Sequence, residues 1–292
     1  MTDERESPEE PRVEPDHSRT HQVERQRRNL AEGAADGKAA RRVRAVLIVG
    51  AVAFGSSVAL ATSLSDRPAL PTTLAALLLI LLPALSLAQT TPNVEVASHR
   101  KELYTSTAIL LFALGALGLL GSWFLEVVPR QLLHPPPSLL LTLSAAALVC
   151  AACLGITYLF HILRHRAGWM ERPIVHDMMP DTREEKRLFA VLSLAAGTGE
   201  EIAFRGFLPA YLSPWFGSYL AAALIPALAF GLMHAYQGAH GIARTTLMGV
   251  VMAVGVWWTG SLWPVIVAHT VLDLVLGLVL KDYFLAEATS ER

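Results

Sequence analysis

The sequence is short of charged residues and of cysteine. Only 17% of its 292 residues are charged, whereas 53% are hydrophobic, and the charges crowd into the first 44 positions and a few loops. This profile indicates an integral membrane protein. Because 24 Lys and Arg nearly cancel 25 Asp and Glu, the net charge gives no indication of an acidic substrate, and we expect no nucleic-acid partner.

The two cysteines form a CxxC pair, Cys150 and Cys153, inside the apolar run LSAAALVCAACLGITYLF. We interpret them as small packing residues on one helix face. Redox CxxC motifs usually stand at the start of a soluble helix, where the pKa of the thiol is lowered. Cysteine usage therefore says little about the compartment.

The first 44 residues have almost no aromatic or β-branched residues and are rich in Pro, Glu, Arg, Asp and Ser. Such a segment buries too little surface to offset its ordering entropy, so we expect 1–44 to be a disordered tail. Its basic half, which ends in RRVR at 41–44, directly precedes the first apolar run. The positive-inside rule then places this tail in the cytoplasm.

Hydrophobic runs of about 20 residues, the length that crosses a bilayer, recur along the rest of the chain. They predict an all-α, polytopic membrane bundle of about eight helices. Four spans fall in 45–187 and four in 188–280, and 281–292 forms a short tail. The expected spans are 45–64, 69–88, 105–124, 138–163, 188–211, 218–236, 245–260 and 262–280.

Loop charge gives the orientation of the spans. The loops at 89–104 and 164–187 are rich in charge, whereas those at 65–68, 125–137 and 212–217 hold few Lys or Arg. Both termini should therefore be cytoplasmic, and we place the protein in a bacterial plasma membrane. Glycines at 115, 118 and 121 recur at helical near-neighbour spacing, which predicts close helix packing.

The segment GTGEEIAFRGFL at 197–208 brings three charges into the fifth span. Exposed to lipid and unpaired, they would together cost about 8 to 10 kcal/mol, so they must face the protein interior. Glu201 and Arg205 are four residues apart and share a helix face, so we expect them to neutralise each other. This leaves Glu200 available for chemistry, although a buried ion network that only fixes helix packing would also explain the three charges.

Two later spans carry titratable residues as well. His234 follows Phe230 by four residues in FGLMHAY, and His269 precedes Asp273 by four in VIVAHTVLDL. Either histidine alone could be an ordinary hydrogen-bonded core residue. Together with Glu200 they resemble a general-base hydrolytic site, in which a carboxylate takes a proton from water and a histidine donates to the oxyanion.

Three short motifs carry a family resemblance. EEIAFRG matches EExxxR, FGLMH matches FxxxH, and HTVLD matches HxxxN/D, in the order and spacing of the CPBP family of intramembrane proteases, which includes CAAX prenyl endopeptidases and Abi proteins. The resemblance covers 188–280. It implies that Glu200 and His234 activate water and that His269 and Asp273 stabilise the oxyanion. It leaves Glu201, with Arg205 and Phe230, in supporting roles.

Asp273 departs from the prenyl-endopeptidase branch, which has asparagine at this position. An ionised aspartate cannot donate to an oxyanion. Asp273 is then either protonated, or it accepts a hydrogen bond from His269 and leaves that ring to donate. We favour the second arrangement, because residues four apart on a helix lie on one face.

The expected cofactor requirement is none, with zinc as the alternative. Two histidines and a carboxylate could hold Zn²⁺ with one open position, and the ligands would be Glu200, His234 and His269. However, the sequence lacks HExxH, and its buried site does not need a metal to explain its residues.

The expected partners are the lipid bilayer and a membrane-associated protein or peptide substrate. Another reading is a catalytically silent membrane protein of the same fold that binds a peptide, a lipid or a partner helix, in an immunity or scaffold role. A small transporter is a weaker reading, because the chain has no internal repeat and no paired Gly/Pro-broken helices.

Overall fold

The computed structural model describes residues 17–64, 68–88, 96–125, 133–134, 136, 138–167 and 172–285, with side chains from residue 40 onward except those of residues 64, 165 and 285. Internal contacts divide the chain into two units, Met1–Arg44 and Ala45–Arg292. The helix α1 (His17–Leu64) begins inside the tail that we expected to be disordered, and residues 1–16 lie outside the described residues. Good helix formers such as Ala, Glu, Gln and Arg are frequent in 17–44, which favours extending the helix backward from the apolar run.

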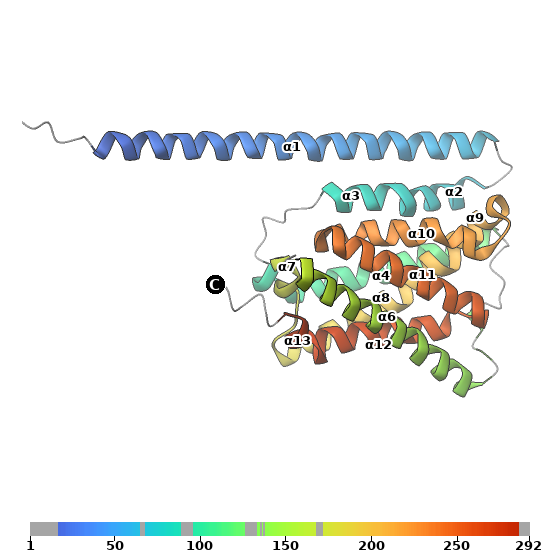
Figure 1. Ribbon diagram of the computed structural model, residues 1–292. Helices are drawn as coiled ribbons and strands as arrows, with labels where there is room; N and C mark the ends of the chain where they lie inside the picture. Colours follow the sequence, from blue (N-terminus) through green and yellow to red (C-terminus); the bar gives the residue numbers. More distant parts are fainter. Residues whose placement is uncertain are drawn as a thin grey trace, which may run out of the picture. The chain divides into compact units, whose positions relative to one another are not determined.

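The described part of the second unit is built of helices joined by short connections (Figure 1). In the first half of the unit, beyond α1, these are α2 (Ala69–Ala76), the π-helix η1 (Leu77–Leu81), α3 (Leu82–Ala88), η2 (Val96–Ser98), α4 (Arg100–Leu125) and α6 (Leu139–Ala167). In the second half they are α7 (Pro173–Asp177), α8 (Arg183–Glu201), the π-helix η3 (Ile202–Phe207), α9 (Leu208–Phe216), α10 (Tyr219–Met233), η4 (Ala235–Gln237), α11 (Gly238–Thr259), α12 (Trp263–Leu274), the π-helix η5 (Val275–Val279) and α13 (Lys281–Leu285).

Helices occupy each position at which the sequence predicts a membrane span, which confirms a polytopic helical bundle. Within the described residues, five helical segments are long and apolar enough to cross a bilayer, and Tyr219–Met233 and Trp263–Val279 are shorter apolar helices. The remaining predicted span runs from α8 to α9 and contains the charged EExxxR segment. The five long segments are Ala40–Ser63, Ala69–Ala88, Arg100–Leu125, Leu139–Arg164 and Ala235–Thr259.

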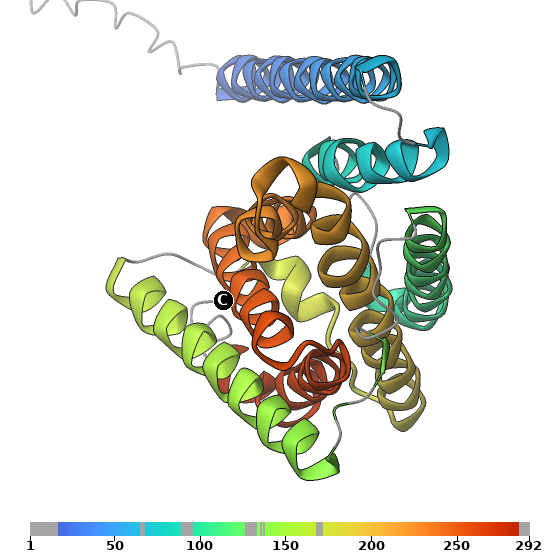
Figure 2. The same ribbon diagram turned by 90° about the vertical axis from the view of Figure 1, so that its right-hand side faces the viewer.

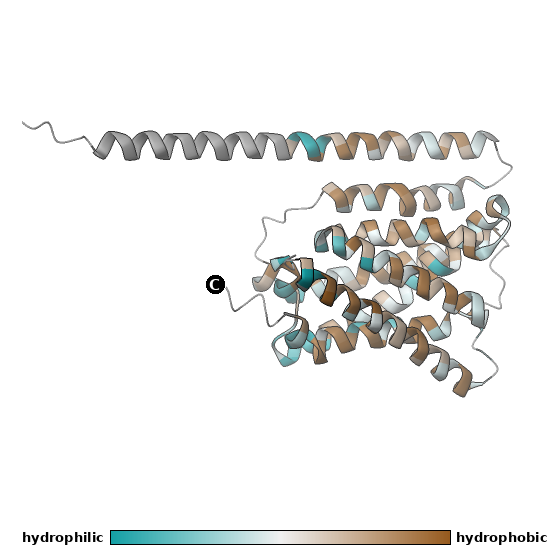
Figure 3. Ribbon diagram, in the orientation of Figure 1, coloured by the Kyte–Doolittle hydropathy of each residue, from teal (hydrophilic) through white to brown (hydrophobic). Residues whose placement is uncertain are grey.

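The second unit has apolar side chains outside and charged side chains inside. Trp123 and Leu140 are 79% and 77% exposed, whereas Glu201 and Arg205 are 0% and 2% exposed. Figure 3 shows hydrophobic residues along the helices and hydrophilic residues gathered at the end where α7 and α13 lie. An exposed apolar surface of this extent is incompatible with water and is expected of a protein surrounded by lipid.

Helix α8 packs against α4 on one side and α12 on another, and α10 packs against α11. Figure 2 looks along these helices and shows them side by side. The predicted glycine contacts are confirmed, because α4 approaches the α8–η3 segment through small residues. A Cβ on Gly115 would lie 2.9 Å from the Cα of Gly199, and one on Gly118 would lie 3.1 Å from the Cα of Ala203.

Local sequence explains where the site-bearing helices begin. Thr182 and Glu185 form a capping box at the start of α8, in which each side chain accepts from the other's backbone N–H. Ser218 caps α10 by accepting from the backbone N–H of Ala221. Helix α11 begins at Gly238 rather than at the predicted residue 245, so the predicted turn QGAHGIAR is mostly helix.

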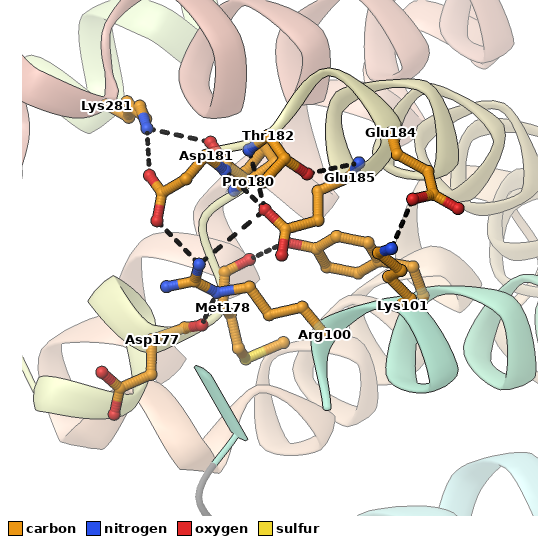
Figure 4. Close-up of polar contacts among 11 residues, drawn as sticks. Arg100, Lys101, Asp177, Met178, Pro180, Asp181, Thr182, Glu184, Glu185 and Lys281 are labelled. Carbon is orange, nitrogen blue, oxygen red and sulfur yellow. Dashed lines mark hydrogen bonds and ion pairs between the residues drawn. The ribbon is translucent and has the colours of Figure 1, made fainter. Parts of the chain in front are cut away.

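A polar cluster joins three elements at the end of the bundle where α4 begins (Figure 4). One carboxylate oxygen of Asp181 lies 2.7 Å from Nη1 of Arg100 on α4. The other lies 2.9 Å from Nζ of Lys281 on α13. Arg100 also donates to the backbone oxygen of Asp177, and Tyr104 donates to that of Met178. The cluster therefore fixes the α7–α8 connection against α4 and α13.

Asp181→Asn should lower the free energy of unfolding by about 1 kcal/mol or less, because its side chain is 59% exposed and solvent screens both ion pairs. The hydrogen bond from Lys281, with a further one from Arg100, lowers the pKa of Asp181 below its ordinary value. This stabilisation is therefore complete above about pH 4, the unfolded pKa, and is lost as the pH falls through the lowered folded pKa. Denaturation of both proteins in detergent between pH 3 and 7 measures the effect.

In that experiment the difference between wild type and Asp181→Asn should shrink toward the acidic end. Asp282→Asn, which changes an exposed aspartate of α13, is the matched control and should leave stability unchanged at every pH. A difference between wild type and Asp181→Asn that is constant from pH 3 to 7 would contradict the ion-pair explanation.

Candidate active site

The candidate residues come from three helices that meet around one cavity. Glu200 and Glu201 end α8, His234 follows the last residue of α10, and His269 lies on α12. Both glutamates and His269 are buried, and His234 is half-buried. The cavity has a volume of about 310 Å³, and all four residues line it together with half-buried Asp273.

Glu201 is the centre of a buried ion network. Its Oε1 lies 2.9 Å from Nη1 of Arg205, as the four-residue spacing predicts. The same oxygen lies 2.7 Å from Nδ1 of His269, a contact between α8 and α12 that the sequence does not indicate. Glu201 therefore neutralises Arg205 and also orients His269, because a carboxylate oxygen can only accept the proton on Nδ1.

The other ring nitrogen of His269 faces two carboxylates. Nε2 lies 3.7 Å from Oε2 of Glu200 and 3.8 Å from Oδ2 of Asp273. Both distances are longer than a hydrogen bond, so a third polar atom could bridge the groups. Asp273 lies beside His269 as expected, but 3.8 Å is too long for the direct hydrogen bond that we predicted, and Glu201 accepts a hydrogen bond from the other ring nitrogen, Nδ1.

Phe230 lies next to three side chains of the site. Its ring lies 4.3 Å from the guanidinium carbon of Arg205, a cation–π contact, and its centroid lies 4.8 Å from that of His234 and 6.2 Å from that of His269. The backbone oxygen of Phe230 accepts a hydrogen bond of 2.8 Å from Nδ1 of His234. In the neutral ring this leaves the lone pair on Nε2.

Two of the π-helices begin within two residues of acidic positions of the site. The first, η3, begins after Glu201 and carries Arg205, and the second, η5, begins two residues after Asp273. π-Helical turns are rare and frequently occur at functional sites. They are not predicted from hydropathy, because the period of the apolar residues changes only slightly where one extra residue enters a turn.

Sequence reasoning overlooked one side of the cavity. Tyr236, Gln237 and Arg244 line it, although none of them is among the residues that the sequence singles out. The signal in the sequence was the charge of Arg244. Because α11 begins at Gly238, this cation lies about two turns inside the helix.

A zinc site would require Glu200, His234 and His269 to meet around one metal position. Over the ranges that the structure describes, no group of three or more His, Cys, Asp or Glu is arranged to hold a metal ion. The hydrogen bonds on Nδ1 leave Nε2 of both histidines as the atoms that could bind a metal, an arrangement common among histidine ligands. Among the described residues, however, Glu200, His234 and His269 do not form a three-ligand group that could hold zinc as they stand, and we derive no step through a metal.

Comparison with known proteins identifies the segment that holds the site. Residues 184–275 match the family model described as type II CAAX prenyl endopeptidase Rce1-like. Neither curated proteins nor solved structures give a match. The matched segment runs from the first turn of α8 into η5 and contains Glu200, His234, His269 and Asp273. Over residues 184–275 the chain is therefore similar to Rce1-like type II CAAX prenyl endopeptidases, which supports the resemblance that the three motifs carry.

Proposed function

We propose that this chain is an intramembrane endopeptidase that hydrolyses a peptide bond of a membrane-associated protein or peptide. The observation that carries the proposal is the convergence of Glu200, His234 and His269, from three helices, on one cavity inside the matched domain. Buried titratable groups in a membrane bundle are costly, which favours a chemical role over simple packing.

In this mechanism Glu200 is the general base. Its carboxylate takes a proton from water, and the resulting hydroxide adds to the carbonyl carbon of the scissile peptide bond. His234 accepts a hydrogen bond from that water at Nε2, because its Nδ1 is held by the backbone oxygen of Phe230. The protonated Glu200 then gives its proton to the leaving amine as the tetrahedral intermediate collapses.

His269 stabilises the oxyanion of that intermediate. With Nδ1 held by Glu201, a protonated ring donates from Nε2, which faces the cavity between Glu200 and Asp273. Asp273 then offsets the charge of the imidazolium at 3.8 Å rather than donating to the oxyanion itself. Glu201 and Arg205 are positioning residues, because both act through His269 or through the helix packing.

We also propose that the end of the bundle with Arg100, Lys101 and Lys281 faces the cytoplasm, which would place both termini there. Exposed tryptophans lie toward the opposite ends of their helices, as expected of an aromatic belt at the other membrane surface. These tryptophans are Trp123, Trp215, Trp257, Trp258 and Trp263.

Comparative membrane peptidomics of wild type and Glu200→Gln tests the proposal. We expect specific peptide fragments in wild-type membranes that disappear in the variant, because the base is lost while the carboxamide keeps the shape of the side chain. The recovered fragment ends would also identify the substrate. Equal fragment sets from both strains would instead favour the non-catalytic binding protein, in which the same cavity holds a peptide, a lipid or a partner helix.

A further inference from the structure

Arg244 is a cation on the wall of the same cavity as Glu200, His234 and His269. It lies on α11, two turns after Gly238, and its side chain is half-buried. Two other cavity-lining cations already face carboxylates, because Arg205 contacts Glu201 and Lys281 contacts Asp181. Of the Lys and Arg residues that line the cavity, this leaves Arg244.

The contacts of Arg244 are with neutral groups. Its Nη2 donates to Oε1 of Gln237 at 2.8 Å, and Nε2 of Gln237 donates to the hydroxyl of Tyr236 at 3.0 Å. Within the described part of the chain, no carboxylate lies within ion-pair distance of Arg244, although acids line the same cavity. A half-buried cation without a counter-charge is costly, which indicates that its anion arrives with a ligand.

The position of Arg244 connects it with the reacting groups. The ring of Tyr236, which closes the Arg244–Gln237–Tyr236 chain, lies 5.9 Å from the ring of His234. A guanidinium has five N–H donors in a planar fork that matches a carboxylate, and the bond to Gln237 uses only one of them. An anion held here would lie beside the proposed water-activating histidine.

We propose that Arg244 is a specificity-determining residue that binds a carboxylate of the substrate and so sets which peptide bond reaches Glu200 and His234. Gln237 is its positioning residue, because it fixes one edge of the guanidinium and leaves the others toward the cavity. The inference rests on the proposed peptidase function. The carboxylate could be the C-terminus of the substrate or an acidic side chain, and the two sources are separated by experiment.

Three fluorescent, apolar hexapeptides serve as probes: one with a free C-terminal carboxylate, its C-terminal amide, and an amide that carries an internal glutamate. Binding is measured to full-length Glu200→Gln protein, which should hold peptide without turnover. Cleavage is measured with wild type. We expect the preferred carboxylate peptide to bind about 10- to 100-fold more tightly than the plain amide, which is the range of a charged hydrogen bond.

Arg244→Gln, placed in both backgrounds, should abolish this discrimination, mainly by raising Kd and KM of the carboxylate peptide. Arg244→Lys should restore part of it, because the charge returns without the fork. Arg166→Gln, which removes an exposed cation of α6, is the matched control and should change nothing. A preference for the first probe assigns the C-terminus, and a preference for the third assigns an acidic side chain.

Several outcomes overturn the inference. If Arg244→Gln weakens the binding of all three peptides equally, Arg244 has a structural role. If the variant still discriminates between the peptides, Arg244 does not bind the carboxylate. No binding of any probe also counts against it. In proteoliposomes, the effect of Arg244→Gln on binding could depend on anionic lipid and not on the charge of the peptide. That result would show that Arg244 contacts lipid phosphate. Discrimination in binding without any cleavage would instead contradict the peptidase function and keep the carboxylate site.

Discussion

Glu200→Gln is expected to lower kcat/KM for peptide cleavage by about 10²- to 10⁴-fold, the usual contribution of a general base, with an unchanged midpoint of thermal unfolding. The carboxylate of Glu200 makes no contact shorter than 3.7 Å with His269, so the fold does not depend on its charge. A glutamine keeps the volume and loses only the ability to take a proton. Cleavage rates and thermal unfolding in detergent measure the two effects on the same preparation.

Glu201→Gln should behave differently, although the two glutamates are adjacent. Its loss leaves Arg205, 2% exposed, without its counter-charge, and a broken buried ion pair costs about 3 to 5 kcal/mol. It also replaces the carboxylate that orients His269 with a neutral amide, which weakens that hydrogen bond. We therefore expect a marked loss of stability together with a loss of activity. A loss of activity without a loss of stability indicates a general base, whereas a loss of both indicates a positioning residue.

Glu184→Gln is the matched control on the same helix, because Glu184 is an exposed residue paired with Lys101 at the surface. It should keep both activity and stability. The assignment of roles is reversed if Glu201→Gln is stable and inactive while Glu200→Gln still cleaves. Full activity of both variants would contradict the hydrolytic mechanism as a whole.

Most of the fold could be predicted because a bilayer restricts the backbone. Lipid offers no hydrogen bonds, so each apolar run of sufficient length has to be a helix, and hydropathy locates it. The start of α11 was misplaced because QGAHGIAR contains two glycines, a histidine and an arginine, which lower hydropathy. Gln237 and Arg244 line the cavity and both glycines are buried within the fold, so the polarity of this segment does not mark a loop.

The site could be predicted only within single helices. Spacing four residues apart gave the Glu201–Arg205 pair and placed His269 and Asp273 on one face. The contact between Glu201 and His269 joins α8 to α12, and its existence depends on how closely those helices pack. Spacing along the chain carries no such information, so the sequence placed Asp273 beside His269 but did not reveal the hydrogen bond between Glu201 and His269.

Close packing of α4 against α8 leads to the second large effect. A Cβ at Gly199 would lie 1.9 Å from the backbone oxygen of Leu111 and 2.7 Å from its carbonyl carbon, so Gly199→Ala must move the two helices apart. Forcing a methyl group into a packed core costs about 1 to 3 kcal/mol. Because Glu200 is the next residue, the displacement reaches the base directly, and a misplacement of about 1 Å can cost about 10²-fold in rate.

Gly155→Ala isolates this steric effect, because a Cβ on Gly155 of α6 meets no atom within 4 Å. Alanine is also the better helix former, so this control should keep its rate and gain up to about 1 kcal/mol. Gly199→Ala should lose both rate and thermal stability in the same assays. If it cleaves and unfolds like Gly155→Ala, then α4 and α8 do not meet at Gly199, and the position of Glu200 does not depend on that crossing.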